Sequence, residues 1–102
     1  LWVSDPMHGN TVTLPSGLKT RSFEAILREI ERSFDVHEAE GTFLGGVHFE
    51  LTGEDVTECI GAGLSEADLD RKYLSVCDPR LNGRQGIDLA FRVAELIRSN
   101  LN

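Results

Sequence analysis

Short strand-like runs alternate with amphipathic helical stretches along this 102-residue chain, and this alternation constrains the fold more than any other feature. The expected strands cover residues 1–4, 47–51 and 74–77. The expected helices cover residues 23–40, 65–73 and 84–101. The order β-α-β-α-β-α predicts an α/β fold of parallel βαβ units with right-handed crossovers. Such a run of units belongs either to an open α/β sheet or to a (β/α)8 barrel.

The stretch that begins at Ser22 carries a complete helical signature. Its apolar residues recur at helical spacing and are Phe23, Ile26, Leu27, Ile30 and Phe34. Ser22 is the expected N-cap, and Gly41 is the expected C′ residue. The segment 6–21 before this helix contains several turn signals and is expected to be a long loop.

The last expected helix is apolar over a wide stripe. Its expected core positions are Ile87, Ala90, Phe91, Ala94, Ile97 and Leu101. Leu89, Val93 and Leu96 widen the stripe, which predicts that this helix packs on two neighbours. The shorter helix before it starts at Ser65, and Asp68 completes a capping-box pattern with that serine.

Acidic residues outnumber basic ones in this chain, and its formal net charge is −7. That excess disfavours nucleic acid or an anionic membrane surface as the main partner, because both would repel the chain. The sequence offers no apolar segment long enough to span a bilayer and no signal-peptide pattern. The two cysteines form no CxxC pair, which predicts a reducing, cytoplasmic location.

The two ends of the sequence differ in character. The sequence opens inside an apolar run without an initiator methionine, and it closes with a helical pattern that dissolves into polar residues. This contrast predicts a natural C-terminus and a truncated N-terminus. Residues 1–102 are therefore expected to form a single partial domain.

Ionisable residues stand where each expected strand ends. His8 follows the first strand, Glu50 nearly ends the second, and Asp78 follows the third. Because the strand-to-helix loops of parallel α/β folds converge at one edge, these three residues are expected to meet there. One imidazole and two carboxylates suit a divalent cation such as Mn²⁺, Fe²⁺, Co²⁺ or Zn²⁺ and leave positions open for substrate. The alternative is that they only cap or solvate the strand ends, since an aspartate before a proline is a common turn pattern.

Other ionisable residues compete with this triad. Glu54, Asp55 and Glu58 are rival carboxylates, interpreted here as solvating the start of a helix. His48 shares a strand face with Glu50 and is expected to support the ligands or the core rather than to bind the ion.

Lys19 and Arg21 directly precede the N-terminus of the first expected helix. Backbone N–H groups and the helix dipole favour an anion at such a position, so the pair is a candidate site for a substrate phosphate. Arg80, beside Asp78, is a candidate of the same kind. The alternative interpretation is that these residues are solvated loop cations.

Five continuous motifs resemble one enzyme family. They are Leu-Trp-Val-Ser-Asp-Pro-Met-His-Gly-Asn-Thr at 1–11, Gly-Leu-Lys-Thr-Arg at 17–21, Gly-Gly-Val-His-Phe-Glu-Leu-Thr-Gly at 45–53, Val-Thr-Glu-Cys at 56–59 and Cys-Asp-Pro-Arg-Leu-Asn at 77–82. In this order, over nearly the whole chain, they resemble class II 3-deoxy-D-arabino-heptulosonate 7-phosphate (DAHP) synthase. The resemblance implies a (β/α)8 TIM barrel in which this chain supplies the C-terminal three βα units, the sixth to eighth.

The resemblance also implies an activity. Class II DAHP synthases condense phosphoenolpyruvate with erythrose 4-phosphate and release phosphate, which is the first step of the shikimate pathway to chorismate and aromatic amino acids. The family's metal ligands match His8, Glu50 and Asp78, so the implied cofactor is one divalent ion, Mn²⁺, Co²⁺, Fe²⁺ or Zn²⁺. The complete enzyme is implied to be a homo-oligomeric transferase, and the isolated 102-residue piece is expected to be inactive.

The sequence departs from the family pattern at several points. The family's fourth metal ligand, a cysteine, and most groups that hold phosphoenolpyruvate belong to upstream parts of the barrel. Residues 42–46 read Thr-Phe-Leu-Gly-Gly in place of the commoner Thr/Ser-His-Pro-Gly-Gly, and the stretch 61–64 is shorter than usual. Two other functions stay open. One is a non-catalytic truncated paralogue that serves as a binding or regulatory module, and the other is a metal-dependent hydrolase with His48 as its base.

Overall fold

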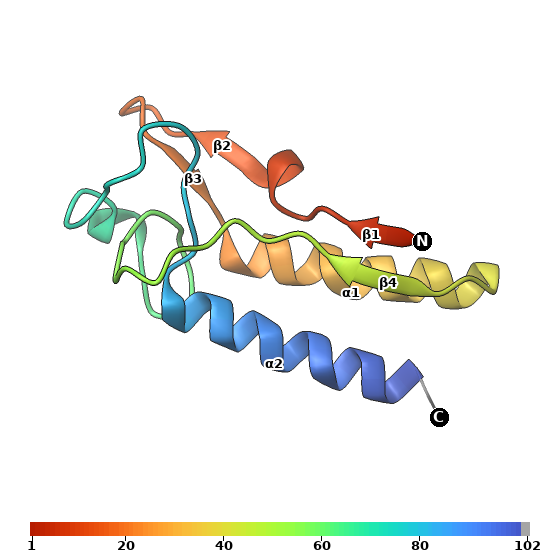
Figure 1. The fold of residues 1–102 in the computed structure, drawn as a ribbon. Coiled ribbons are helices and arrows are strands. Elements are labelled where there is room, and N and C mark those ends of the chain that lie inside the picture. Colours follow the sequence, from red (N-terminus) through yellow and green to blue (C-terminus); the bar gives the residue numbers. More distant parts are fainter. Residues whose placement is uncertain (101–102) are drawn as a thin grey trace.

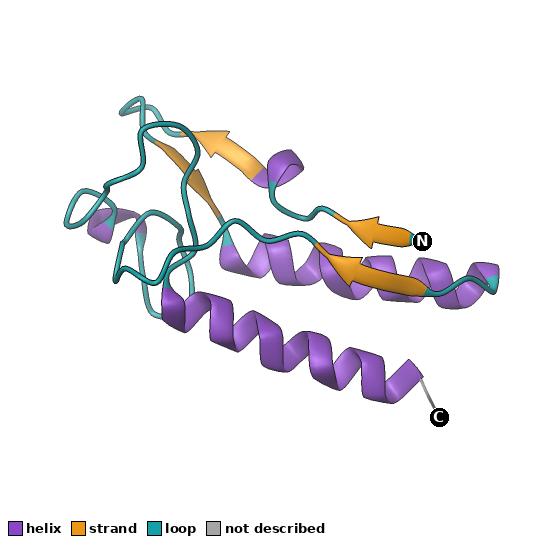
Figure 2. Ribbon diagram, viewed as in Figure 1, coloured by secondary structure: helices purple, strands orange, loops and turns teal. Residues whose placement is uncertain are grey.

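The computed structural model describes residues 1–100 and has a mixed α/β arrangement of two long helices and short strands (Figure 1; Figure 2). The strands are β1 (Trp2–Ser4), β2 (Thr11–Thr13), β3 (Lys19–Arg21) and β4 (Leu44–Val47). The α-helices are α1 (Phe23–Glu40) and α2 (Gly83–Asn100). The connections contain two 3-10 turns, η1 (His8–Asn10) and η2 (Glu66–Asp68).

β1, α1 and β4 form a parallel βαβ unit, as the alternation of the sequence predicts. Ser4 of β1 lies opposite Val47 of β4, and the N–H of His48 donates to the carbonyl of Ser4 over 2.7 Å. Both strands run against the direction of α1, so their carboxyl ends lie at the end of the molecule where α1 begins (Figure 1). The candidate site residues gather at this shared edge.

The predicted bounds of α1 are confirmed by its caps. The hydroxyl of Ser22 accepts a hydrogen bond from the N–H of Ala25 over 3.2 Å. Gly41 has a left-handed φ of 72°, and the N–H of the next residue, Thr42, donates to the carbonyl of His37 over 2.9 Å. The predicted apolar stripe faces the core, and its buried residues are Phe23, Ile26, Ile30 and Phe34.

The segment 6–21 is more ordered than the predicted loop. β2 and β3 pair antiparallel, with Thr11 opposite Arg21 and Thr13 opposite Lys19. The turn between them lies where the sequence signals indicate, and the N–H of Gly17 donates to the carbonyl of Leu14 over 2.8 Å. Each strand has only 3 residues, which is too short to produce a recognisable alternating pattern.

The strand predicted at residues 74–77 does not form. The N–H groups of Leu74 and Ser75 donate to the carboxylate of Glu58, over 2.8 and 2.9 Å, instead of to a neighbouring strand. Parallel pairing occurs further along, where Leu81 donates to the carbonyl of Glu50 over 3.0 Å. Pro79 has no N–H to pair, so the strand-like contact begins beyond it.

Two other predicted elements differ from the observed ones. β4 covers Leu44–Val47 rather than 47–51, because Leu44 and Gly46 pair with Trp2 and Val3 of β1, with an irregularity in the register at Gly45. At 65–73 the structure has only η2, whose start carries the predicted bond from the N–H of Ser65 to Asp68, of 2.8 Å. The helix stops there because the N–H and the carbonyl of Lys72 are both hydrogen-bonded to Thr57, over 2.9 Å each.

α2 buries a different face from the predicted one. Leu89 is fully buried, and Val93 and Leu96 pack against the same core. Ile87 and Phe91, expected in the core, are 59% and 69% exposed. The expected Leu101 lies outside the described residues. The correction follows from the packing of α2 beside α1, which turns only one side of the wide apolar stripe inward.

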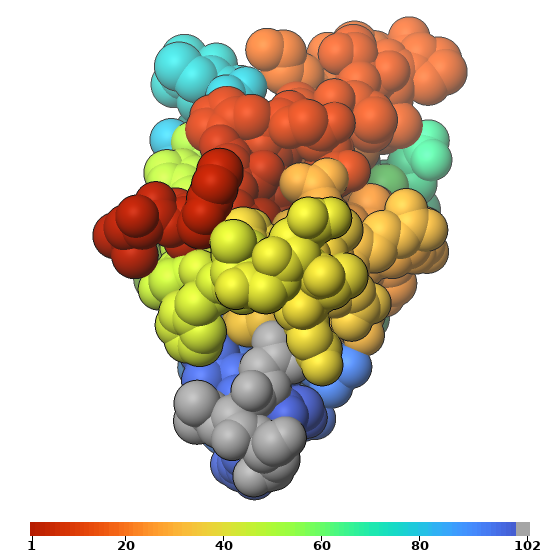
Figure 3. Space-filling view, turned by 90° about the vertical axis from the view of Figure 1, so that its right-hand side faces the viewer, coloured from red at the N-terminus to blue at the C-terminus, as the bar shows by residue number. Residues whose placement is uncertain are grey.

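The core lies between the two helices and the segments around β4. Its buried members include Met7, Leu44 and Leu81. Seen from the end that carries the N-terminus (Figure 3), the first residues project beside the β4 segment and α2 lies beneath it. The side chains of Trp2 and Val3 are correspondingly 59% and 55% exposed. Within residues 1–100, neither helix combines the length and apolarity that crossing a membrane requires.

The observed orientation of α2 predicts unequal effects of two neighbouring substitutions. Leu89→Ala is expected to lower the free energy of unfolding of the 102-residue chain by about 2–5 kcal/mol, because it removes a fully buried side chain. Ile87→Ala is the matched control and is expected to cost much less, because Ile87 is largely exposed. Urea denaturation measures both, and equal losses would contradict the observed packing.

Candidate metal centre

The structure brings His8, Glu50 and Asp78 together. Each offers one ligand atom, and these atoms all lie within 4.8 Å of one another. They come from the turn after β1, the segment after β4 and the loop before α2. The convergence expected from their positions in the sequence is therefore present, although the third residue follows a loop rather than the predicted strand.

A tight turn after β1 positions His8. One oxygen of Asp5, Oδ1, accepts hydrogen bonds from the N–H groups of Met7 and His8, over 3.0 and 3.2 Å. Burial acts to raise the pKa of Asp5, but the bonds from Met7 and His8 outweigh it and hold that pKa below its usual value. A charged carboxylate is therefore available to orient the imidazole.

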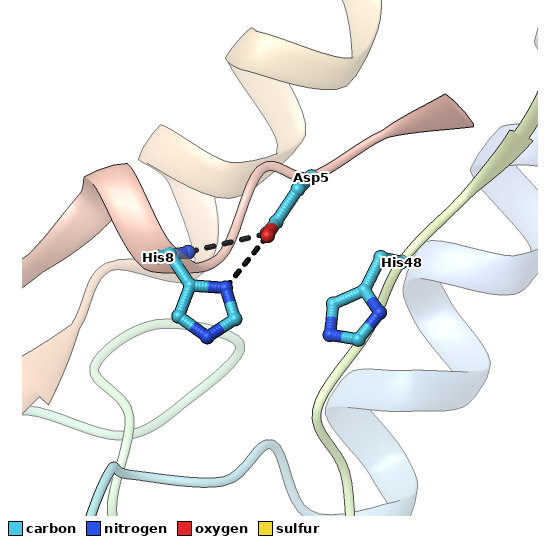
Figure 4. Close-up of side chains that lie close together, drawn as sticks. All are labelled: Asp5, His8 and His48. Atoms are coloured by element: carbon cyan, nitrogen blue, oxygen red, sulfur yellow. Dashed lines mark hydrogen bonds and ion pairs between the residues drawn. The ribbon is translucent and has the colours of Figure 1, made fainter. Parts of the chain in front are cut away.

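Asp5 also decides which nitrogen of His8 is free. Its Oδ2 lies 2.6 Å from His8 Nδ1 (Figure 4). Because a carboxylate can only accept, Nδ1 carries the proton, and in the neutral ring Nε2 keeps its lone pair. Metal-bound histidines in proteins are commonly held in this way by a carboxylate on the second nitrogen.

The free nitrogen of His8 faces a carboxylate oxygen of Glu50. His8 Nε2 lies 3.5 Å from Glu50 Oε2. Two acceptors that face each other need a cation or a proton between them, and this separation is roughly that of two atoms bound to one ion at about 2.1 Å. The donor set and its spacing therefore fit a divalent cation.

A second group of possible ligands shares the same histidine. Asp5, His8 and His48 also offer ligand atoms within 4.8 Å of one another, and Figure 4 shows Asp5 and His8 on the turn after β1 with His48 facing them from the segment after β4. The rings of His8 and His48 lie 5.7 Å apart. Since Nδ1 of His8 is already bonded to Asp5, we interpret Asp5 and His48 as surroundings of the first group rather than as a separate set of ligands.

Arg21 lies inside the site rather than at its surface. Its side chain is fully buried, and Nη1 donates to Glu50 Oε1 over 2.5 Å and to the carbonyl of Pro79 over 2.8 Å. This placement argues against the predicted contact of Arg21 with a substrate phosphate, because the guanidinium is enclosed by the chain's own acceptors.

Lys19 and Arg80 are the accessible cations of the site. Lys19 Nζ lies 3.6 Å from Asp78 Oδ1, and its side chain is 52% exposed. Arg80 Nη1 lies 3.6 Å from Glu50 Oε2, and its side chain is 40% exposed. Positive charge therefore borders the candidate ligands on a face that an anionic substrate could reach.

Glu58 holds the loop that carries Asp78. Its side chain is fully buried, and it accepts hydrogen bonds from the N–H groups of Leu74, Ser75 and Arg80, over 2.8, 2.9 and 2.8 Å. Burial acts to raise the pKa of Glu58, but the bonds from Ser75, Arg80 and Leu74 outweigh it and hold that pKa below its usual value. The interpretation of Glu58 as a solvating residue at a helix start is therefore wrong.

The sequence contains a signal that could have indicated this role. Glu58 stands between Val56 and Cys59, and both of these apolar residues are buried in the structure. Burial raises the pKa of the Cys59 thiol to about 12, so this cysteine is a packed side chain rather than a nucleophile. A lone carboxylate in an apolar stretch of a loop needs internal donors.

Comparison with known proteins places the chain in a family. The class-II DAHP synthetase family matches residues 1–94. The chain belongs to this family. It is 54% identical over 99 residues to the phospho-2-dehydro-3-deoxyheptonate aldolase of Streptomyces coelicolor. It is 51% identical over 100 residues to the phospho-2-dehydro-3-deoxyheptonate aldolase AroG of Mycolicibacterium smegmatis.

The matches cover the chain and a small part of these relatives. The two alignments include 95% and 96% of this chain, and each covers 22% of the relative. The phospho-2-dehydro-3-deoxyheptonate aldolase of Streptomyces lividans is 52% identical over 99 residues, which is 95% of this chain and 68% of that protein. The chain therefore spans less than a quarter of the length of the Streptomyces coelicolor and Mycolicibacterium smegmatis relatives.

The hydrogen bonds of Glu58 predict a pH-dependent stability. Glu58→Gln is expected to lower the free energy of unfolding near neutral pH by about 1.5–3 kcal/mol, because an amide has one acceptor oxygen for donors that surround two. The stabilisation requires the charged carboxylate, so it is present above the usual glutamate pKa of 4.5 and is lost as the pH falls through the lower pKa of the folded state.

The difference in stability between the unmodified chain and Glu58→Gln is thus expected to shrink below about pH 4. Urea denaturation at a series of pH values measures it. Glu66→Gln, at an exposed position of η2, is the control for loss of one carboxylate. A difference that stays constant down to acid pH would contradict the assigned charge of Glu58.

Proposed function

We propose that this chain supplies the sixth to eighth βα units of the (β/α)8 barrel of a DAHP synthase. That enzyme would condense phosphoenolpyruvate with erythrose 4-phosphate, the activity class named for the relatives. The observation that carries the proposal is the convergence of His8, Glu50 and Asp78 in a chain whose family membership is established. The parallel βαβ unit, with the site at the carboxyl ends of its strands, supports the barrel.

We assign His8, Glu50 and Asp78 as ligands of one divalent cation, Mn²⁺, Co²⁺, Fe²⁺ or Zn²⁺. When bound, such an ion would supply Lewis acidity toward the aldehyde oxygen of erythrose 4-phosphate. Asp5 keeps the proton of His8 on Nδ1 and leaves Nε2 for the ion. Glu58 holds the loop of Asp78, so that the Asp78 carboxylate stays beside His8 and Glu50.

The accessible cations would receive the anionic substrate. Lys19 and Arg80 flank the carboxylates from two different segments, β3 and the loop before α2. A phosphate at this border would replace the long contact between Lys19 and Asp78 by a direct hydrogen bond to Lys19 Nζ. This assignment keeps Lys19 as a candidate phosphate ligand and leaves Arg21 out of direct substrate contact.

Ligand substitutions in a chimera test the proposal. The chimera is the Streptomyces coelicolor relative in which this chain replaces the matching 99-residue segment. His8→Ala, Glu50→Gln and Asp78→Asn are each expected to abolish consumption of phosphoenolpyruvate and to weaken metal binding sharply, because each removes one ligand. Glu54→Gln is the matched control, because Glu54 is 64% exposed and pairs with Lys72.

Phosphoenolpyruvate absorbance and calorimetric metal titration measure these effects. An unmodified chimera that folds but neither binds a divalent metal nor consumes phosphoenolpyruvate would contradict the proposal and favour a non-catalytic module. A fully active Glu50→Gln chimera would contradict the ligand assignment alone.

Replacement of Lys19 by alanine is expected to weaken the binding of erythrose 4-phosphate specifically. In the chimera, KM for erythrose 4-phosphate is expected to rise about ten- to a hundredfold, because a charged hydrogen bond to the phosphate contributes about 1.5–3 kcal/mol. KM for phosphoenolpyruvate is expected to change much less. Lys72→Ala is the matched control, since its side chain pairs with Glu54. Equal kinetics of the Lys19→Ala and unmodified chimeras would make Lys19 a solvated cation.

A further inference from the structure

We propose that Arg21 is a positioning residue that binds one oxygen of Glu50 and thereby reserves the other, Oε2, for the metal ion. This inference rests on the proposed function, because it concerns the same candidate metal centre. It assigns to Arg21 a role different from the phosphate contact expected from the sequence.

Arg21 is built into the chain on three sides. Its Nε donates to Thr11 Oγ1 over 2.7 Å, which fixes the plane of the guanidinium from the neighbouring strand β2. Its Nη1 donates to Glu50 Oε1 and to the carbonyl of Pro79. The side chain is fully buried, so these bonds form in a region of low dielectric where charged pairs are strong.

The ion pair divides the two oxygens of Glu50 between two tasks. Oε1 is held by Arg21 Nη1 over 2.5 Å. Oε2 lies on the side of His8 Nε2, 3.5 Å away, and so faces the other ligand atoms. With Oε1 occupied, Glu50 can offer the ion only one oxygen, in a direction that the guanidinium fixes.

Arg21 also connects the two carboxylate ligands. Through Pro79 it holds the residue next to Asp78, and its Nη2 lies 3.9 Å from Asp78 Oδ2. Nη2 is buried and has no hydrogen-bond partner among residues 1–100. A small shift of Asp78 would give this group its acceptor, so the guanidinium is placed to hold Glu50 and Asp78 at a set separation.

A purely Coulombic role and a positioning role of Arg21 predict opposite changes in metal affinity when Arg21 is removed. A positive guanidinium near a cation site repels the ion, so a purely Coulombic role would make the ion bind more tightly after Arg21→Met. The positioning role predicts weaker binding, because Glu50 and Asp78 lose their common anchor. Lysine retains the charge but has one nitrogen and cannot reach Thr11, Glu50 and Pro79 together, so Arg21→Lys is expected to resemble Arg21→Met.

Co²⁺ titration followed by visible absorption tests the inference in the full 102-residue chain and, where that chain binds no Co²⁺, in the chimera. Arg21→Met and Arg21→Lys are expected to weaken Co²⁺ binding about 10–100-fold, the usual effect of removing a group that orients a ligand. They are also expected to change the absorption bands, because Glu50 becomes free to bind through both oxygens. Arg92→Met is the matched control, since it breaks an arginine–glutamate pair between α2 and α1 away from the site.

A milder variant covers the case in which loss of Arg21 unfolds the chain. Thr11→Val keeps the shape of the side chain. It removes the acceptor of Arg21 Nε together with the longer bond, of 3.3 Å, from the Thr11 hydroxyl to the carbonyl of Met7. It is expected to weaken Co²⁺ binding less than Arg21→Met but more than Arg92→Met. Circular dichroism of each variant identifies any loss of fold. In a Glu50→Gln background, Arg21→Lys is expected to have a smaller effect than in the unmodified protein, because only its hold on the loop of Asp78 is still to be lost.

The outcomes separate the inference from the proposed function. No Co²⁺ binding by either unmodified protein contradicts the metal centre and the role of Arg21 with it. Binding by the unmodified protein with unchanged affinity and spectrum in folded Arg21→Lys and Thr11→Val overturns the role of Arg21 and leaves the metal centre standing. Tighter binding in Arg21→Met overturns it in favour of simple charge repulsion.

Discussion

The parallel pairing of β1 with β4 is the constraint on which the rest of the structure depends. A parallel pair joined by α1 places both carboxyl ends at one edge, so the turn after β1 and the segment after β4 must lie side by side. The backbone bond from Leu81 to Glu50 brings the loop before α2 to the same edge. His8, Glu50 and Asp78 meet for this reason, although they are far apart in the sequence.

Hydrogen bonds to charged side chains replace strand pairing in the third segment. A short loop without strand partners must satisfy its backbone N–H groups in another way. Glu58 accepts hydrogen bonds from the N–H groups of Leu74, Ser75 and Arg80. Arg21 satisfies a carbonyl of the same loop by donating to Pro79. The position of Asp78 is thus set by buried polar groups that lie in other segments, and the fold and the site share the same interactions.

The parts of the fold that local rules determine were predictable from the sequence. α1 was predicted with both caps and its buried face, and the first strand and the turn near Pro15 were also correct. The absent third strand and the shortened second helix depended on partners at Glu58 and Thr57, which no local pattern contains. The buried face of α2 was mispredicted because its stripe is apolar on two sides and only the position of α1 decides between them.

The candidate site likewise combines features that follow from the sequence pattern with features that depend on distant partners. Strand ends in a parallel arrangement explain why His8 and Glu50 converge, because the pairing of β1 with β4 brings them to one edge. Asp78 was expected after a strand that does not form, and it reaches the same edge through the bonds of Glu58 and the bond from Leu81 to Glu50. The role of Arg21 could not be read in the same way, since a cation before a helix has the same local sequence whether it meets solvent or a buried carboxylate. Burial decides between these cases: an enclosed guanidinium needs acceptors that stay in place, and the carboxylate that accepts from it is held in turn. The interaction that makes Arg21 tolerable inside the chain is therefore also the one that leaves Glu50 Oε2 facing His8 Nε2.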